Sequence, residues 1–521
     1  MKSTTPGSCL STFDLPAARS VERNPAQSRL RELALSLMPR ITETEFGNLN
    51  YQAEVTARLK NSTFFVSDVE NYQNRMSSAE ASQWAAQQDA YIANQDMLLI
   101  EGYVGPDPGF RTGARLYIER TQPNIAGMQA QLYFTPDEHW TPEFTVVYTP
   151  GLGAPGKPDD RLIIVDLDNY VTRVFGSDYF GESKMGGLRM WNHLVYQRGG
   201  LALHAGLKTF PAGSTRSGAE ESMLIIGLSG TGKTTTTFRK QAGSLPVQDD
   251  FVVLMPGGVI HTTEAGCFAK TYGLDPEDEP TIYEGTTNEN AWLENVAVSE
   301  SGEVDFFDTS YTANGRSTFP LADIRHRDPT HVPPARYLLI LNRSDHVIPA
   351  VARLSREQIP AYFMLGETKG TSAGGAAEAG KSLRVPGTNP FFFDDDSYQG
   401  NRLAEILATV PDLEAFVLNT GRIGGEGPDS KKVRIRDSSA VVQGIVEGTI
   451  EWGRDRDFGY EVAESVPGVE DPELLQPARL YDRLGREDAY EEMVTRLKTE
   501  RREYLEGFQS LEPSIAAGLT G

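Results

Sequence analysis

The hydrophobic positions of this chain fall mainly into short runs bounded by polar residues, glycine or proline. Such runs occur at residues 97–100, 144–148, 162–165, 223–226, 251–255, 337–341 and 415–418. Apolar runs of this length are typical of buried strands. Helical spacing is clearest over residues 29–38, which Pro39 ends. It also marks a stripe near the C-terminus, which we interpret as core packing, formed by Tyr490, Met493, Val494 and Leu497. The pattern predicts an α/β fold.

The arrangement of these segments predicts two domains. Residues 1–25 are rich in Ser, Thr, Pro and Ala, and we expect them to be disordered. Residues 26–200 carry recurring strands and form an N-terminal α/β domain, and residues 201–521 form a C-terminal domain. Within the latter, residues 366–390 contain many Gly, Ala, Ser and Thr residues. A loop of that length inside a compact domain is typical of a lid or a disordered segment.

Composition narrows the class of protein. The net charge of −23 argues against a nucleic-acid-binding surface. No apolar run approaches the ~18 residues of a membrane span, and the N-terminus lacks a signal-peptide pattern. The two cysteines, Cys9 and Cys267, lie far apart, as in proteins of a reducing compartment. We therefore expect a cytoplasmic protein, a monomer or small homo-oligomer, without nucleic-acid or membrane partners.

One segment carries a specific motif. Residues 227–234 read Gly-Leu-Ser-Gly-Thr-Gly-Lys-Thr, which fits the pattern G-x-x-x-x-G-K-[ST], and an apolar run precedes them. No Gly or Pro follows until after Ala242, so a short helix fits there. A strand, a Gly-rich turn and a helix direct backbone N–H groups toward an anion. We therefore predict a phosphate loop in which Lys233 reaches the β- and γ-phosphates and Thr234 holds Mg²⁺. A purely structural glycine turn is the alternative.

Other candidate residues are ambiguous when each is taken alone. Asp249 and Asp250 follow the loop at a distance suited to a neighbouring strand end, where a carboxylate can hold or orient the metal of a nucleotide. A solvated turn is the alternative there. His204 lies in an apolar run, where a satisfied core histidine is the more common case. Arg316 and Lys270 would by themselves be ordinary surface residues.

Taken together, these segments resemble the ATP-dependent phosphoenolpyruvate carboxykinases. Residues 227–235 have that family's form of the phosphate loop, and residues 264–270 look like its Glu-Gly-Gly-Cys-Tyr-Ala-Lys block. Further similar blocks occur in order at residues 103–108, 179–182, 279–283, 293–296, 316–320 and 419–421. The resemblance covers about residues 45–450, and it is weaker before the phosphate loop than after it.

The resemblance implies a fold and a reaction. The family has two α/β domains around a deep interdomain cleft, with the phosphate loop in the C-terminal domain and a mobile lid near residues 366–390. Its reaction converts oxaloacetate and ATP into phosphoenolpyruvate, CO₂ and ADP, a step of gluconeogenesis. Decarboxylation yields an enolate whose oxygen attacks the γ-phosphate. The cofactors implied are ATP with Mg²⁺ and a second metal, usually Mn²⁺.

The family's nucleotide and metal residues carry over to matching positions. The resemblance implies that ATP is bound by the loop residues Gly227, Leu228, Ser229, Gly230, Thr231, Gly232, Lys233, Thr234 and Thr235. Lys432 and Ser438 fall where the family contacts adenine, although the family usually has Arg and Thr there. Thr234 would bind Mg²⁺, while His204 and Asp250 match two ligands of the second metal. Imidazole plus carboxylate is a chemically sensible pair for Mn²⁺.

A second group matches the part of the family's site that binds the acid. Arg58 matches an arginine that grips the substrate carboxylate, a job that suits a bidentate fork, and Tyr179 matches a tyrosine lining the substrate pocket. Arg316 matches the arginine that neutralises charge on the transferred phosphoryl group, and Lys270 matches the lysine beside it. The catalytic set expected is therefore Lys233, Asp249, Lys270, Arg316 and Arg58.

One departure from the family concerns the second metal. The family segment ends Glu-Met-Lys-Lys-Gly, and its second lysine is a metal ligand, whereas residues 182–186 read Glu-Ser-Lys-Met-Gly. Met185 therefore occupies the ligand position, and its thioether suits Mn²⁺ poorly. Lys184 is adjacent, but neighbours on an extended segment point to opposite faces. It could replace the ligand only if the backbone shifts, and we expect Lys184 to be one of the substrate-binding residues, with Arg58, Tyr179 and Arg316.

Two enzymatic hypotheses follow. The first is a divergent ATP-dependent phosphoenolpyruvate carboxykinase with an altered metal site. The second is an ATP-dependent kinase on the same scaffold that phosphorylates a different small hydroxy acid or a protein, without decarboxylation. The HPr kinases, which share a related phosphate-loop core, are the precedent for a protein substrate. A nucleotide-binding regulatory protein is a third hypothesis, but it gives Arg316, Asp250 and Lys270 no reason to occur together.

Overall fold

The structure is a computed structural model that describes residues 13–68, 74–228, 230–369, 382–392 and 394–520. The chain forms two compact units. Unit 1 comprises residues 1–194, 264–274 and 284–323, and unit 2 comprises residues 195–263, 275–283 and 324–521. Both contain helices and sheets, which confirms the α/β prediction. The predicted contiguous domains differ from these units, because two segments after residue 200 return to supply strands to unit 1.

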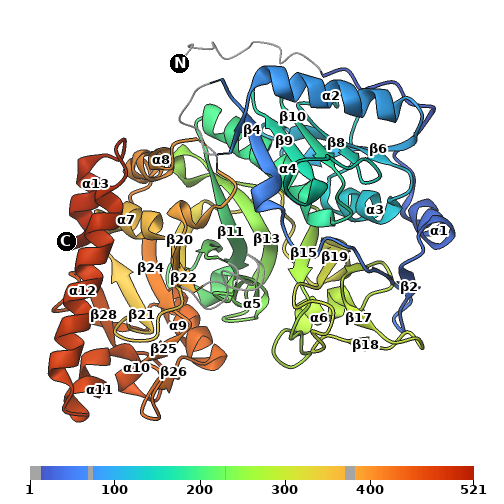
Figure 1. Ribbon diagram of the computed structural model, residues 1–521. Coiled ribbons are helices and arrows are strands. Elements are labelled where there is room, and N and C mark those ends of the chain that lie inside the picture. Colours follow the sequence, from blue (N-terminus) through green and yellow to red (C-terminus); the bar gives the residue numbers. More distant parts are fainter. Residues whose placement is uncertain (1–12, 69–73, 229, 370–381, 393, 521) are drawn as a thin grey trace. The chain divides into compact units, whose positions relative to one another are not determined.

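The larger sheet of unit 1 has eight strands, in the order β1-β6-β7-β8-β10-β9-β4-β5 (Figure 1). Their bounds are Ser20–Arg23, Asp96–Val104, Thr112–Glu119, Phe144–Thr149, Val171–Phe175, Leu162–Asp166, Thr63–Val66 and Arg75–Met76, in that order. The apolar runs predicted as strands at 97–100, 144–148 and 162–165 lie in β6, β8 and β9.

The predicted disorder of residues 1–25 is wrong at its C-terminal end. Ser20–Arg23 form β1, which pairs in parallel with β6. The edge of β6 supplies hydrogen-bond partners to the backbone of this polar segment, which its composition does not reveal. Residues 1–12 of the same prediction lie outside the described residues.

The smaller sheet of unit 1 joins segments from distant parts of the chain. Its strands follow the order β15-β19-β16-β3-β2, with the bounds Gly266–Lys270, Arg316–Pro320, Trp292–Glu294, Leu49–Tyr51 and Ile41–Glu43. Helix α3 (Pro123–Leu132) contacts β6 of the larger sheet and β19 of the smaller one. Gly127 permits this packing, because a Cβ there would lie 2.6 Å from the ring of Trp292 on β16.

Three more helices begin in unit 1: α1 (Gln27–Leu37), α2 (Ser78–Ile92) and α4 (Phe180–Gln197). Helix α1 confirms the helix predicted at its place. Helix α4 contradicts the expectation that Lys184 and Met185 lie on an extended segment. Glycines in the middle of α4 lower its helix propensity, but they let it lie against the sheet. A Cβ at Gly186 would come within 3.1 Å of the Thr172 side chain on β10.

Unit 2 is built on a nine-stranded sheet in the order β14-β13-β11-β12-β20-β24-β21-β28-β27 (Figure 1). The bounds are Ile260–Thr262, Leu245–Leu254, Leu201–Phe210, Glu221–Ile226, Ala335–Asn342, Glu414–Asn419, Val351–Leu354, Glu461–Ser465 and Glu451–Arg454, in that order. The four apolar runs predicted as strands after residue 200 lie mainly in β12, β13, β20 and β24.

Alternation along the strands of unit 2 creates two cores. On β20, Leu338 and Ile340 enter one core and Tyr337 and Leu339 the other. The first core is completed by α7 (Gln358–Leu365), α8 (Ser397–Ala408), α12 (Glu487–Glu506) and α13 (Pro513–Ala517). The second is completed by α9 (Ile435–Glu447), α10 (Pro472–Leu475) and α11 (Pro477–Arg483). The stripe on α12 lies in the first core, as predicted.

The remaining elements are short. They are α5 (Lys233–Phe238), α6 (Pro280–Thr286), and the paired strands β17 (Ala297–Val298) with β18 (Val304–Asp305), β22 (Glu367–Lys369) with β23 (Ser382–Arg384), and β25 (Arg422–Ile423) with β26 (Lys431–Lys432). Of the predicted lid, residues 370–381 lie outside the described residues. Among the residues that are described, no helix is both long and apolar enough to cross a membrane.

Candidate active site

The candidate phosphate loop, residues 227–232, leads from β12 to α5. Gly230 and Gly232 have φ values of +86° and +88°, a region in which a side chain is strained. At Gly227 a Cβ would lie 2.5 Å from Oγ1 of Thr231. Ser229 lies outside the described residues. The backbone path therefore favours glycine at positions 227, 230 and 232, for two different reasons.

Helix α5 is held close against β11. A Cβ at Gly206 would lie 1.9 Å from Oγ1 of Thr237, so only glycine allows the helix to approach this far. At the far end of the helix, the buried Lys208 donates hydrogen bonds from Nζ to the carbonyl oxygens of Thr236 (2.9 Å) and Arg239 (2.6 Å). A cation at a helix C-terminus is stabilising. The sequence analysis missed Lys208, although a lysine inside an apolar run is a signal that could have indicated it.

The side chain of Thr234 meets a carboxylate from the next strand. Its Oγ1 donates a hydrogen bond to Oδ2 of Asp249 across 2.6 Å. The other oxygen of Asp249, Oδ1, is buried and has no hydrogen-bond partner among the described residues. Asp249 lies within β13, not at a strand end as predicted. Because it pairs with Gly206 of β11, it lies on the face of the sheet that packs against α5. A hydroxyl beside a carboxylate with a spare oxygen suits Mg²⁺.

His204 and Asp250 form a second close pair. Nε2 of His204 lies 3.0 Å from Oδ1 of Asp250, and Nδ1 lies 3.0 Å from the carbonyl oxygen of Thr388. The ammonium group of Lys233 lies 3.3 Å from the same oxygen of Asp250. The structure thus brings together three of the predicted site residues, which come from β11, α5 and β13.

The protonation of His204 indicates what this pair can hold. A carbonyl oxygen only accepts hydrogen bonds, so the ring proton belongs on Nδ1. Burial, and then the charge of Lys233, lower the pKa of His204, which favours the neutral ring. The contacts with Asp250 and with the Thr388 carbonyl oxygen oppose this shift. A neutral ring with its proton on Nδ1 would leave Nε2 available to bind a cation.

The separation within the pair also fits a metal. Adjacent ligands of an octahedral ion with bonds of about 2.1 Å lie about 3 Å apart, and imidazole with carboxylate suits Mn²⁺. In the described part of the chain, no three His, Cys, Asp or Glu side chains form a metal-binding cluster. His204 and Asp250 would therefore hold the ion as a pair, together with ligands of another kind.

The remaining nucleotide candidates come from α5, β26 and α9. Thr235 donates a hydrogen bond from Oγ1 to Glu279, and burial raises the pKa of that carboxyl group. Glu279 belongs to the family-like block at residues 279–283, but no role was predicted for it. Lys432 is exposed on β26 and Ser438 is buried in α9. Among the described residues, no hydrogen bond joins either of these two to the loop.

In unit 1, four polar side chains form a row across the smaller sheet. The pairing of β15, β19, β16 and β3 places Lys270 opposite Arg316, Arg316 opposite Glu294, and Glu294 opposite Tyr51. Paired residues share one face of a sheet. Burial and the charge of Arg316 lower the pKa of Lys270 to about 8. Burial raises the pKa of Glu294, also to about 8. The predicted neighbours Lys270 and Arg316 are thus adjacent.

Tyr179 and Arg316 are joined through Asn314. Oδ1 of Asn314 accepts a hydrogen bond from Nη2 of Arg316 (2.9 Å), and its Nδ2 donates to the hydroxyl of Tyr179 (3.3 Å). Both Asn314 and Tyr179 are buried. The sequence analysis missed Asn314, and only its place two residues before Arg316 could have indicated it.

Lys184 is engaged by a carboxylate and a ring. Its Nζ lies 2.9 Å from Oε1 of Glu264 and 5.1 Å from the centroid of the Phe268 ring, over which Arg316 also lies at 5.1 Å. Met185, the next residue on α4, is buried. Lys184 therefore lies near Arg316, as its predicted substrate role requires, but Glu264 balances its charge.

Arg58 lies half-buried on the irregular segment after β3. Burial lowers the pKa of Arg189 on α4, and the positive charge of Arg58 adds to this effect. Arg189 also lies 3.5 Å from Glu182. Arg58 and Arg189 are therefore close enough for their charges to interact. No pattern in the sequence indicated a role for Arg189.

Comparisons with known proteins identify the family of this chain. The family model described as phosphoenolpyruvate carboxykinase matches residues 19–472. A protein of Mesorhizobium japonicum named phosphoenolpyruvate carboxykinase (ATP) is 28% identical over 450 residues, which cover 83% of this chain and 80% of the relative. A relative of the same name from Aeropyrum pernix is 30% identical over 438 residues, 81% of this chain and 83% of the relative.

A third relative of that name, from Nitrobacter hamburgensis, is 30% identical over 396 residues, which cover 73% of this chain and 71% of the relative. The match extends over most of both chains. The protein belongs to the phosphoenolpyruvate carboxykinase family, and the resemblance noted in the sequence is confirmed.

Proposed function

We propose that this protein is an ATP-dependent phosphoenolpyruvate carboxykinase, which converts oxaloacetate and ATP into phosphoenolpyruvate, CO₂ and ADP. The observation that carries the proposal is a group of contacts in a chain whose family model spans residues 19–472. Thr234 lies against Asp249, and both Lys233 and His204 lie against Asp250. This is the set of groups that positions a nucleotide and its metal for phosphoryl transfer.

The residues proposed to bind the nucleotide lie in unit 2. The backbone N–H groups of the loop bind the phosphates, and Lys233 exchanges its contact with Asp250 for the β- and γ-phosphate oxygens. Thr234 and Asp249 hold Mg²⁺, and His204 and Asp250 hold the second cation, for which we propose Mn²⁺. When bound, these ions neutralise the charge that develops on the phosphate oxygens. The half-buried Glu279, which holds Thr235, is proposed to contact the nucleotide as well.

The residues proposed to bind the acid lie in unit 1. Arg58 binds a carboxylate of oxaloacetate, and the buried hydroxyl of Tyr179 orients it. Arg316, steadied by Asn314, faces the transferred phosphoryl group, and Lys270 adds a second cation. Because Lys270 and Arg316 lie on adjacent strands, their geometry is fixed before the substrate arrives.

The experiment that tests the proposal is phosphoenolpyruvate formation from oxaloacetate and ATP with Mg²⁺ and Mn²⁺, with the Lys233→Ala variant as the blank. We expect product above the blank. A folded protein that binds ATP but forms no phosphoenolpyruvate would overturn the proposal.

One observation favours a second candidate function, a kinase that phosphorylates a different small hydroxy acid or a protein without decarboxylation. Met185 stands where the family has a metal-binding lysine, and Lys184 is balanced by Glu264. The decarboxylating end has therefore lost a cation that the family uses. ADP formation that depends on an added hydroxy acid or protein, and not on oxaloacetate, would support this function.

A further inference from the structure

The segment that carries Arg58 is held in an unusual way. Between β3, which ends at Tyr51, and residue 60 the backbone forms no regular strand or helix. Side chains from other segments hold it instead. Oδ1 of Asn295 accepts a hydrogen bond from the Ala53 N–H (2.7 Å), and Nδ2 of Asn314 donates to the carbonyl oxygen of Thr56 (2.6 Å).

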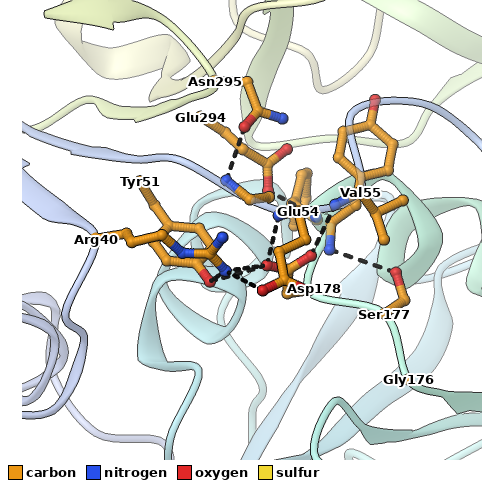
Figure 2. Close-up of polar contacts among 12 residues, drawn as sticks. Arg40, Tyr51, Glu54, Val55, Gly176, Ser177, Asp178, Glu294 and Asn295 are labelled. Atoms are coloured by element: carbon orange, nitrogen blue, oxygen red, sulfur yellow. Dashed lines mark hydrogen bonds and ion pairs between the residues drawn. The ribbon is translucent and has the colours of Figure 1, made fainter. Parts of the chain in front are cut away.

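Asp178 holds this segment just before Arg58. Its Oδ2 accepts hydrogen bonds from the Glu54 N–H (2.8 Å) and the Tyr51 hydroxyl (2.9 Å), and its Oδ1 accepts from the Val55 N–H (3.0 Å). Nη2 of Arg40 lies 3.1 Å from Oδ2. Figure 2 shows these donors converging on the one carboxylate. Asp178 is buried, so these bonds are shielded from water.

Glu182 holds the same segment just after Arg58. Its Oε1 accepts a hydrogen bond from the Leu59 N–H across 2.6 Å, and its side chain is fully buried in the first turn of α4. Arg189, about two turns further along α4, lies 3.5 Å from the other oxygen. The two carboxylates therefore come from one short stretch, and Tyr179 lies between them in sequence.

We propose that Asp178 and Glu182 are positioning residues for the acid: they fix the backbone on both sides of Arg58 and so aim its guanidinium group at the substrate carboxylate. The inference rests on the proposed role of Arg58. It also explains why an irregular segment carries a residue that needs an accurate position, since a misplacement of about 1 Å can cost about 100-fold in rate. Because Tyr179 is part of the same stretch, one element sets both acid-binding side chains.

Substitution by the corresponding amide should disturb the hydrogen bonds of Asp178 more than those of Glu182. Asp178 uses both oxygens to accept from backbone N–H groups, so in Asp178→Asn one of those donors would face an NH₂ group. Glu182 accepts only one backbone N–H, and in Glu182→Gln the amide oxygen can keep that bond. We therefore expect Asp178→Asn and Glu182→Ala to displace Arg58, and Glu182→Gln to do so much less.

The chain offers a matched control for the aspartate. Asp137, also in unit 1, accepts from the Tyr103 hydroxyl (2.8 Å), the His139 N–H (3.0 Å) and Nη2 of Arg111 (2.6 Å). Its partners are of the same kinds as those of Asp178, but they do not include the segment of Arg58. Asp137 is more exposed than Asp178, so Asp137→Asn reports the kinetic effect of losing a carboxylate with these kinds of partner elsewhere in unit 1, without moving Arg58.

The experiment measures kcat, KM for oxaloacetate, KM for ATP and the melting temperature of the full chain. For Asp178→Asn and Glu182→Ala we expect KM for oxaloacetate to rise about tenfold or more, with KM for ATP unchanged within about twofold. Glu182→Gln should stay within about threefold of the unaltered chain, and Asp137→Asn should leave all three kinetic constants unchanged. A KM for oxaloacetate that stays constant in both Asp178→Asn and Glu182→Ala would overturn the inference.

Binding of oxaloacetate without ATP, followed by calorimetry, separates this inference from the proposed function. If the unaltered chain forms no phosphoenolpyruvate but binds oxaloacetate, and Asp178→Asn weakens that binding, the proposed function fails and the inference stands. If the chain is active and the variants bind oxaloacetate normally, the function stands and the inference fails. A chain that neither turns over nor binds oxaloacetate overturns both. If Asp178→Asn fails to fold, the comparison of Glu182→Ala with Glu182→Gln provides the test.

Discussion

The hydroxyl of Thr234 donates a hydrogen bond to the carboxylate of Asp249 across 2.6 Å. The two residues belong to α5 and β13, and Gly206 on β11 is what lets the helix approach the sheet this closely. A side chain at position 206 would push the helix outward and separate the pair. The metal-binding geometry proposed here therefore depends on a glycine that touches neither the nucleotide nor the metal.

Removing the lysine of the phosphate loop should abolish phosphoryl transfer. Lys233 lies 3.3 Å from Asp250 and is proposed to bind the β- and γ-phosphates. We expect Lys233→Ala to lower kcat by about 1,000-fold or more, because charge on the transferred group is no longer stabilised. The melting temperature of the variant serves as the control for folding. Turnover within about tenfold of the unaltered chain would contradict the phosphate-loop mechanism.

Gly206→Ala should weaken nucleotide binding. The added Cβ would lie 1.9 Å from Oγ1 of Thr237, and α5 must shift to relieve the clash. We expect a loss of about 1–3 kcal/mol in the free energy of unfolding and weaker binding of Mg·ATP, measured by calorimetry. Gly213→Ala is the matched control, because a Cβ at Gly213 would meet nothing within 4 Å. Equal effects of the two substitutions would show that α5 has room to move.

Stability should depend on the protonation of Glu294. Burial raises the pKa of this carboxyl group from its ordinary value of 4.5 to about 8. Between these pH values the folded chain keeps a proton that the unfolded chain releases. The stabilising proton is therefore fully present below about pH 4.5, and the free energy of unfolding falls as pH rises toward 8, by up to about 1.4 kcal/mol per pH unit.

Glu294→Gln removes this titration while keeping the shape of the side chain. Relative to the unaltered chain, the variant should become progressively more stable between pH 5.5 and pH 8.5. Urea unfolding at three pH values in that interval measures the difference. A difference that stays constant with pH would mean that Glu294 is ionised in the folded protein.

Activity should decline on the alkaline side because of Lys270. Burial and the charge of Arg316 lower the pKa of Lys270 to about 8, so its positive charge is present below that pH and is lost as pH rises through it. We expect kcat to fall above about pH 8. Lys270→Arg keeps the charge at every pH tested, so this variant should be less active but should lack the alkaline decline. A decline that persists in Lys270→Arg would assign it to another group.

Met185→Lys should restore a ligand for the second metal if the family alignment holds at this position. We expect the variant to bind Mn²⁺ more tightly in a metal titration, because an amine is a better ligand for this ion than a thioether. Met185→Leu is the control, since it keeps the apolar volume without a donor. An unchanged Mn²⁺ affinity in the lysine variant would mean that position 185 does not face the metal.

The local pattern of the sequence was enough for much of the fold. Buried strands such as β6, β12 and β24 coincide with apolar runs, because a strand covered on both faces needs apolar residues at every position. The loop of residues 227–232 was also predictable, because its glycines are required by backbone angles and by contacts with near neighbours in the chain. Such constraints act over a few residues, so they leave a pattern in the sequence.

Other features needed the tertiary structure. Helix α4 was wrongly expected to be extended, because its glycines weaken the helical signal while their fit against β10 stabilises the helix. The strand at Ser20–Arg23 was expected to be disordered, because its partner β6 lies more than 70 residues away along the chain. Segments beyond residue 260 were assigned to the second domain, although they complete a sheet in unit 1.

The candidate site also has features that the sequence predicted and features that needed the tertiary structure. The residue types of the nucleotide site, and the family to which the chain belongs, could be inferred from the order of motifs in the sequence alone. The sequence could not show that Nε2 of His204 lies 3.0 Å from Asp250, that Glu264 balances Lys184, or that Asp178 and Glu182 hold the backbone on both sides of Arg58. Those relationships join residues far apart in the chain, and their energies depend on burial and on which donor meets which acceptor, so only the folded path of the chain decides them.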